Sequence, residues 1–153
     1  MSVASLLGGR YGLRVDGSTQ ARLDRLLELA RHRHDESAAA YEARLARDPD
    51  ELEWLMERLT VQESEWFRHP AHFELVAERV ARGGGVVWSA GCADGQEAWS
   101  LAMLLEEVGA PGWSVLATDL SADALAAAAT GRYEERRLRG LSAGRRARFL
   151  RAE

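Results

Sequence analysis

The chain has 153 residues and a formal charge of −4, from 20 basic and 24 acidic side chains. This length suits one domain or two small ones with a real core, and the acidic balance argues against a general nucleic-acid binder. The single cysteine, Cys92, excludes an internal disulfide and favours a reducing cytoplasm. Because no apolar run reaches the roughly 20 residues of a spanning helix, we expect no membrane insertion.

Apolar residues at three-to-four spacing predict helices in the first half of the chain. The expected helices cover residues 19–34, 37–47, the stretch that follows Asp50, and 70–82. Ser18 or Thr19 is the expected cap of the first, and Asp50 that of the third. These segments predict a small helical bundle followed by a linker.

The pattern changes after three consecutive glycines, Gly83 to Gly85. The expected elements are a β-type run at 86–90, a turn from Gly91 to Gly95, a helix ending near Gly109, a second β-type run at 113–118 and a helix at 122–130. The order strand, helix, strand, helix predicts the beginning of a parallel sheet and an α/β fold. We therefore expect a helical domain with its linker at 1–82 and an α/β domain at 83–153.

The turn between the first strand and its helix has the residues of a nucleoside site. Gly91 and Gly95 permit a tight turn, and a helix N-terminus supplies free N–H groups. Asp119 follows Gly95 by 24 residues, near the ~20 expected for an acid that binds a ribose. A dinucleotide fingerprint would place glycine where Ala93 and Gln96 stand, so a phosphate-free nucleoside such as S-adenosylmethionine is favoured. The alternative is a purely structural turn beside a surface aspartate.

Three segments of the chain resemble one family. The motifs are VVWSAGCADGQEAWSLAMLL with LATDLSADALAAAATGRY, the upstream LTVQESEWFRHPAHF, and Tyr41 to Leu45 in the helical part. Together they are similar to the CheR-type chemotaxis receptor methyltransferases, which esterify receptor glutamates with S-adenosylmethionine. The resemblance implies a helical N-terminal domain followed by the start of a Rossmann-like methyltransferase unit, with an incomplete sheet.

The resemblance also implies functions for individual residues. Those expected to bind the cofactor are Arg68, Ala90, Gly91, Gly95, Gln96, Glu97 and Asp119. Asp119 would hold the ribose, Gln96 and Glu97 would face the methionine part, and Arg68 would reach the charged end as the catalytic residue. Arg25 and Arg31 would contact an acidic helical segment of a receptor, and no metal is implied.

The chain departs from the family pattern at informative positions. Gln96 stands where the family has glutamate, and Leu29 stands where a second basic residue is usual. No later strand with an Arg-Asn segment follows before Glu153. We therefore expect a protein-glutamate O-methyltransferase that is part of a longer or split enzyme, with self-association or a second chain completing the sheet. The alternative is a non-catalytic module that binds S-adenosylmethionine or a protein.

Two further groups of residues have competing interpretations. Eight arginines follow Gly131, and they form either a site for an acidic partner or a solvated face. The pairs His32/His34 and His69/His72 have spacings compatible with metal ligation, but surface histidines are the better interpretation because other ligands are lacking.

Overall fold

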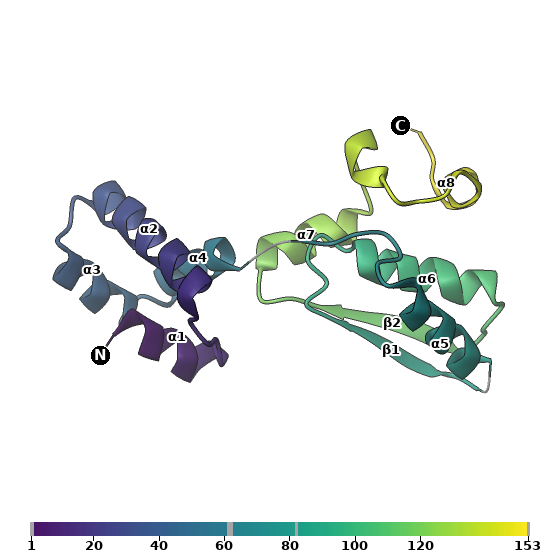
Figure 1. The fold of residues 1–153 in the computed structure, drawn as a ribbon, viewed down its shortest axis with the longest axis horizontal. Helices are drawn as coiled ribbons and strands as arrows, with labels where there is room; N and C mark the ends of the chain where they lie inside the picture. Colours follow the sequence, from purple (N-terminus) through teal and green to yellow (C-terminus); the bar gives the residue numbers. More distant parts are fainter. Residues whose placement is uncertain (1, 61–62, 82, 153) are drawn as a thin grey trace. The chain divides into compact units, whose positions relative to one another are not determined.

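The computed structural model describes residues 2–60, 63–81 and 83–152. The chain forms two compact units, Met1–Val61 and Gln62–Glu153 (Figure 1). Among the described residues, no helix is both long and apolar enough to cross a membrane.

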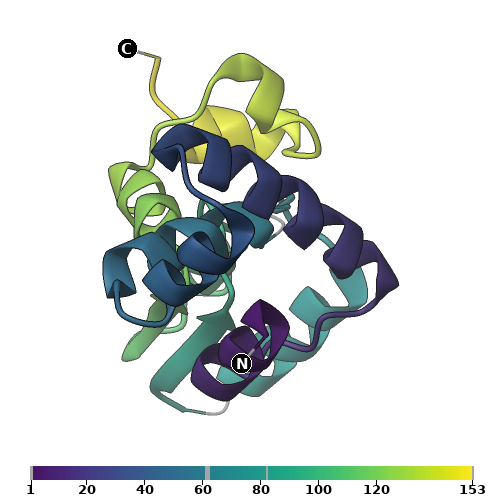
Figure 2. The same ribbon diagram turned by 90° about the vertical axis from the view of Figure 1, so that its left-hand side faces the viewer.

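The first unit is helical. Its helices are α1 (Val3–Tyr11), α2 (Gly17–His34), α3 (Ala38–Leu45) and α4 (Pro49–Leu59), which Figure 2 shows in purple to blue. Leu7, Leu23, Tyr41 and Leu52 are almost fully buried in a single core to which all these helices contribute. Helix α1 has no counterpart among the predicted helices, although Ser2 caps it and Leu7 anchors it.

Two helices begin earlier than their expected caps. The carboxylate of Asp16 accepts the N–H of Thr19 at 2.9 Å, so α2 begins at Gly17. Asp48, and not Asp50, caps α4, because Pro49 occupies the first helical position. There its fixed φ and missing N–H are tolerated.

The second unit contains the predicted strand, helix, strand, helix order. Its elements are α5 (Pro70–Val80), β1 (Gly85–Ala90), α6 (Gln96–Glu107), β2 (Trp113–Thr118), α7 (Ala122–Thr130), a 3₁₀ turn (Glu135–Leu138) and α8 (Ala143–Phe149). The strands pair in parallel, from Gly85 opposite Trp113 to Ala90 opposite Thr118. The expected α/β fold with a short, incomplete sheet is confirmed.

One face of this sheet is covered and the other is open. Val87 and Val115 pack under α5 and α6, where Phe73 and Leu101 lie in the same apolar cluster. On the opposite face, Val86, Trp88 and Leu116 are 59%, 64% and 51% exposed. A parallel sheet is ordinarily covered on both faces, so the described residues form only two of the three layers.

The division between the units falls before α5, whereas the expected boundary follows residue 82. Helix α5 belongs to the second unit because Phe73 packs against Leu101 and Leu104 of α6. The covered face of the sheet therefore depends on a helix that precedes the glycine run.

Candidate cofactor site

The turn after β1 lies at the carboxyl end of both strands. The N–H groups of Gly91 and Cys92 donate to the carbonyl of Thr118, at 2.8 and 3.0 Å. Ala93 has a φ of +48°, a conformation that non-glycine residues rarely adopt. The turn is therefore held against the end of β2 in a specific, strained shape.

Asp119 fixes this turn from the other strand. Its Oδ2 accepts the N–H of Ala93 at 2.8 Å, and its Oδ1 accepts the N–H of Ser121 at 2.9 Å. A carboxylate oxygen can accept more than one hydrogen bond, so each oxygen keeps acceptor capacity for a ligand. Asp119 is thus oriented by the backbone and still able to bind a diol.

The two turn glycines lie in different surroundings. A Cβ placed on Gly91 would meet nothing within 4 Å, so a ligand can approach the backbone there. A Cβ on Gly95 would meet the Cβ of Ala128 at 2.7 Å and the hydroxyl of Tyr133 at 3.1 Å. The open side of the turn is at Gly91, next to the exposed Ala90, whereas Gly95 packs against α7.

Glu97 lies in the first turn of α6, beside the end of β1. The hydroxyl of the fully buried Ser89 donates to its Oε1 at 2.6 Å. An anion at a helix N-terminus is stabilised by the helix dipole. This carboxylate is therefore held at the carboxyl edge of the sheet.

Gln96 is 3% exposed, and only one of the two polar atoms of its side chain has a hydrogen-bond partner among the described residues. Its Nε2 donates to the carbonyl of Arg137 at 2.7 Å, while its Oε1 has no hydrogen-bond partner among the described residues. The Nε1 of Trp66 donates to the same carbonyl at 2.8 Å. A glutamate side chain has no N–H group to donate to this carbonyl. The hydrogen bond therefore explains why a neutral amide stands at position 96.

A segment after α7 closes one side of the turn. The hydroxyl of Tyr133 donates to the carbonyl of Asp94 at 2.7 Å, and the Arg137 guanidinium forms an ion pair with the Asp94 carboxylate. Burial raises the pKa of Tyr133 to about 12, so the hydroxyl keeps its proton. Sequence reasoning missed Arg137 and Trp66, because no local spacing connects them to the turn.

Arg68 lies in the segment before α5, and its side chain is exposed. It has no ion pair among the residues that the structure describes. The neighbouring Phe67 and His69 both have positive φ, of +51° and +57°. The N–H of Phe67 donates to the hydroxyl of Ser100 at 3.0 Å, which fixes this strained backbone against α6.

The two arginines expected to bind a receptor lie on α2, in the first unit. Arg31 donates two hydrogen bonds to the carboxylate of Glu28, at 2.8 and 2.5 Å, so the positive charge of its guanidinium is partly neutralised. Arg25 is exposed and has no partner among the described parts of this unit. Leu29 is also exposed, beside them on the helix.

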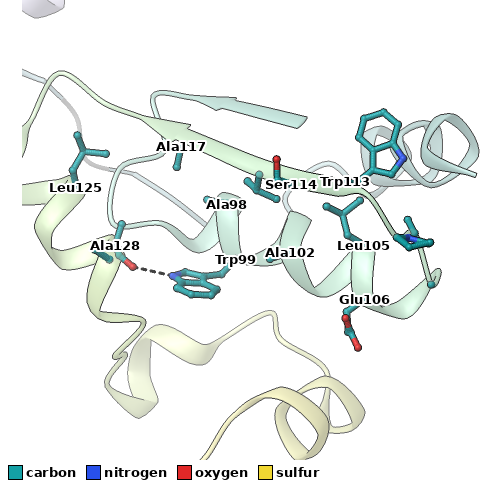
Figure 3. A pocket seen from close by; sticks show the side chains of 15 residues that line it. Ala98, Trp99, Ala102, Leu105, Glu106, Trp113, Ser114, Ala117, Leu125 and Ala128 are labelled. Atoms are coloured by element: carbon teal, nitrogen blue, oxygen red, sulfur yellow. Dashed lines mark hydrogen bonds between the residues drawn. The ribbon is translucent and has the colours of Figure 1, made fainter. Parts of the chain in front are cut away.

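The second unit also contains an apolar cavity. It has a volume of about 910 Å³ and is lined by α6, β2 and α7 (Figure 3). The indole N–H of Trp99 donates to the carbonyl of Ala128 at 2.9 Å, and both residues line this cavity. None of the predicted site residues lines this apolar groove.

The described residues contain no group of three or more side chains suited to hold a metal ion. His69 and His72 have ring centroids 5.4 Å apart, without a third ligand. Cys92 is buried, and burial raises the pKa of its thiol, which argues against a reactive nucleophile.

The model of the CheR methyltransferase S-adenosylmethionine-binding domain matches residues 62–153. The chain belongs to the CheR methyltransferase family. It is 36% identical over 117 residues to chemotaxis protein methyltransferase 1 of Pseudomonas aeruginosa, covering 66% of this chain and 43% of that protein. It is 34% identical over 106 residues to a chemotaxis protein methyltransferase of Listeria monocytogenes, covering 64% and 40%. The chain thus spans less than half the length of these relatives.

The cofactor of this domain is S-adenosylmethionine. The residues at the turn fit it chemically: Asp119 has free acceptor capacity, Gly91 is open, and the buried Oε1 of Gln96 lacks a donor. An adenosine with an ammonium group offers the hydroxyl and N–H donors that these acceptors need.

Proposed function

We propose that this chain is part of an enzyme that methylates glutamate side chains of a receptor in chemotaxis-type signalling. The observation that carries the proposal is Asp119, oriented by two backbone N–H groups beside the open Gly91 in a CheR-family domain. The names of the relatives in Pseudomonas aeruginosa and Escherichia coli, both chemotaxis protein methyltransferases, support the same activity. A cytoplasmic location, expected from the single cysteine, is part of the proposal.

The mechanism needs alignment more than acid–base chemistry. S-adenosylmethionine supplies a methyl group on a positively charged sulfur. A glutamate acceptor is already ionised at neutral pH, so no general base is required. The residues of this chain then have to bind both reactants in line and exclude water.

Each predicted site residue has a role in this proposal. Asp119 binds the ribose, while Glu97 and Gln96 face the methionine part. The backbone of Ala90 and Gly91 lies against the cofactor, and Gly95 lets the turn close. Arg68 orients charged groups at the reaction centre. Its side chain is exposed and forms no ion pair with the residues that the structure describes, so it is available for this role.

Arg25 and Arg31 form the proposed contact with the acceptor protein. They lie on α2 with the exposed Leu29, so this helix offers cations beside an apolar side chain. An acidic amphipathic helix of a receptor has the complementary chemistry.

The open face of the sheet supports the view that the active enzyme is longer or assembled from two chains. Val86, Trp88 and Leu116 are more than half exposed there, and such apolar surface is normally covered. A second chain or a second copy would cover it. The alternative is a non-catalytic module that binds the cofactor or a protein, and the neutral Gln96 favours that view.

Titration calorimetry with S-adenosylhomocysteine and NAD tests the cofactor site. We expect heat with the first and none with the second, and a folded sample that binds neither would refute the proposal. Transfer of labelled methyl from S-adenosylmethionine to a receptor fragment then tests the reaction, with and without the later half of the Pseudomonas aeruginosa relative. Binding without transfer in both mixtures would favour the non-catalytic alternative.

A further inference from the structure

A buried carboxylate in the first unit is surrounded by side chains from α2 and α3. Glu51 lies in the first turn of α4 and is 8% exposed. The hydroxyl of Tyr41 donates to its Oε1 at 2.5 Å, and the Nη2 of Arg33 donates to both carboxylate oxygens, at 2.6 and 2.7 Å. Burial and this hydrogen bond raise the pKa of Tyr41, so its hydroxyl stays a donor. The ring Nε2 of His34 lies 3.3 Å from the other oxygen, Oε2.

His34 also lies within hydrogen-bond distance of Arg33. The Nη2 of Arg33 is 2.8 Å from the same Nε2, and the Nε of Arg33 donates to it at 3.3 Å. A guanidinium can only donate, so in this arrangement Nε2 is an acceptor and the ring is neutral, with its proton on Nδ1. Nη2 carries two hydrogens but approaches three acceptor atoms. Arg33 is therefore shared between His34 and Glu51.

Protonation of His34 would change Nε2 from an acceptor into a donor. Histidine is the side chain that ordinarily gains this proton between about pH 5 and 8. A protonated Nε2 cannot accept from Arg33, and the two cations would repel each other at the present distance of 2.8 Å between Nε2 and Nη2. It can donate to the Oε2 of Glu51, which is already 3.3 Å away. Glu51 would keep a cation as its partner, so the exchange leaves no buried carboxylate unpaired.

Other charged groups near His34 form a separate network. Arg44 on α3 donates to Glu36, with a shortest distance of 2.5 Å, and lies 3.8 Å from Asp48. The hydrogen bonds from Arg44 lower the pKa of Glu36, so this pair stays charged over the range in which histidine ordinarily titrates. His34 is therefore the member of these groups that can change its charge.

Arg33 also connects the cluster to an aromatic ring. Its guanidinium carbon lies 3.9 Å from the centre of the half-buried Trp54 ring, a cation–π contact. We propose that His34 is a pH-sensitive switch, in which protonation moves its Nε2 from Arg33 to Glu51 and releases Arg33 from Glu51 and from Trp54. At low pH the last turn of α2 then presents an additional unpaired cation. The switch lies within the first unit and depends neither on the cofactor nor on the proposed reaction.

Fluorine NMR of the full chain labelled with 5-fluorotryptophan tests the switch. Trp54 is the one tryptophan of the first unit in the sequence, and a Trp54→Phe variant identifies its resonance. We expect this resonance to shift between about pH 5 and 8, with the same midpoint as the ring of His34 in histidine NMR. His34→Gln should abolish the shift, because an amide stays neutral and can still accept from Arg33. His32→Gln is the matched control, because His32 pairs with Glu28 and should leave the shift unchanged.

Nitrogen NMR of the histidine rings gives a second readout. At about pH 8 we expect His34 to be neutral with its proton on Nδ1, and a proton on Nε2 would overturn the proposal. A Trp54 resonance that stays still over the range, or that moves equally in His34→Gln, would do the same. Loss of the shift in His32→Gln would assign the titration to His32 instead. Arg33→Gln should remove the shift while His34 still titrates, and a persisting shift would show that Arg33 is not the group that moves.

Discussion

Substituting alanine for each turn glycine separates the shape of the turn from its contact with the cofactor. Gly95 has a φ of +91°, and a Cβ there would lie 2.7 Å from the Cβ of Ala128. Forcing a non-glycine residue into a left-handed conformation costs roughly 1–2 kcal/mol. Overpacking adds about 1–3 kcal/mol. We therefore expect Gly95→Ala to lower the free energy of unfolding of the second unit by about 2–5 kcal/mol.

Gly91→Ala is the matched variant, because Gly91 also has a positive φ, of +76°, but no atom within 4 Å of the added Cβ. Only the backbone cost of roughly 1–2 kcal/mol applies. The new methyl group would however lie on the open side of the turn, where the cofactor is proposed to approach. We expect Gly91→Ala to weaken S-adenosylhomocysteine binding more than Gly95→Ala does, among molecules that stay folded.

Urea unfolding followed by tryptophan fluorescence measures the stability difference. Trp54 is the one tryptophan of the first unit in the sequence, so a Trp54→Phe background leaves four reporters in the second unit. Calorimetry on the same proteins gives the affinities. Equal loss of stability in the two variants would refute the close packing of Gly95 on α7, and equal affinities would refute the approach of the cofactor at Gly91.

Three further changes test separate contacts. Asp119→Asn should weaken S-adenosylhomocysteine binding by about 1–3 kcal/mol, because the charged acceptor is lost, and unchanged heat in calorimetry would contradict its role. Gln96→Glu should lower the free energy of unfolding by about 1–3 kcal/mol, because a carboxylate would face the carbonyl of Arg137. Equal urea midpoints would contradict that contact. Arg145 donates two hydrogen bonds of 2.8 Å to Glu107 and so lowers the pKa of this carboxyl group in the folded protein. The pair therefore stabilises the fold fully above the unfolded pKa of Glu107, near 4.5, and this stabilisation is lost as the pH falls through the lower pKa of the folded state. Glu107→Gln should therefore flatten the dependence of stability on pH below about 5, and an unchanged acid limb in urea unfolding would contradict the pair.

The local elements of the second unit follow from short-range patterns. The run 113–118 is a strand and the run 122–130 is a helix, both with the expected bounds. Parallel pairing follows from the order of strands and helices. A helix between two strands carries the chain back to the end of the sheet where the first strand began, so the second strand runs in the same direction. The family and the cofactor, both predicted from motifs, are confirmed by the family match.

Caps and domain limits were less well predicted. Asp16 and Asp48 cap their helices in place of the expected residues, because several acceptors stood near each start and only the folded backbone selects one. The helix at 70–80 belongs to the α/β unit, since its apolar face packs on α6. The roles of the predicted site residues stay predictions.

The sequence by itself determined the motif at the turn, the acid after the second strand, and the family. Each of these is a pattern of neighbouring residues, and strand alternation, helix spacing and glycine turns act over such short distances. Only the tertiary structure decided the surroundings of the turn. The amide of Gln96 meets a carbonyl 41 residues away, and Trp66 reaches the same carbonyl across 71 residues. Such contacts depend on how whole elements pack together, so no local spacing in the chain encodes them.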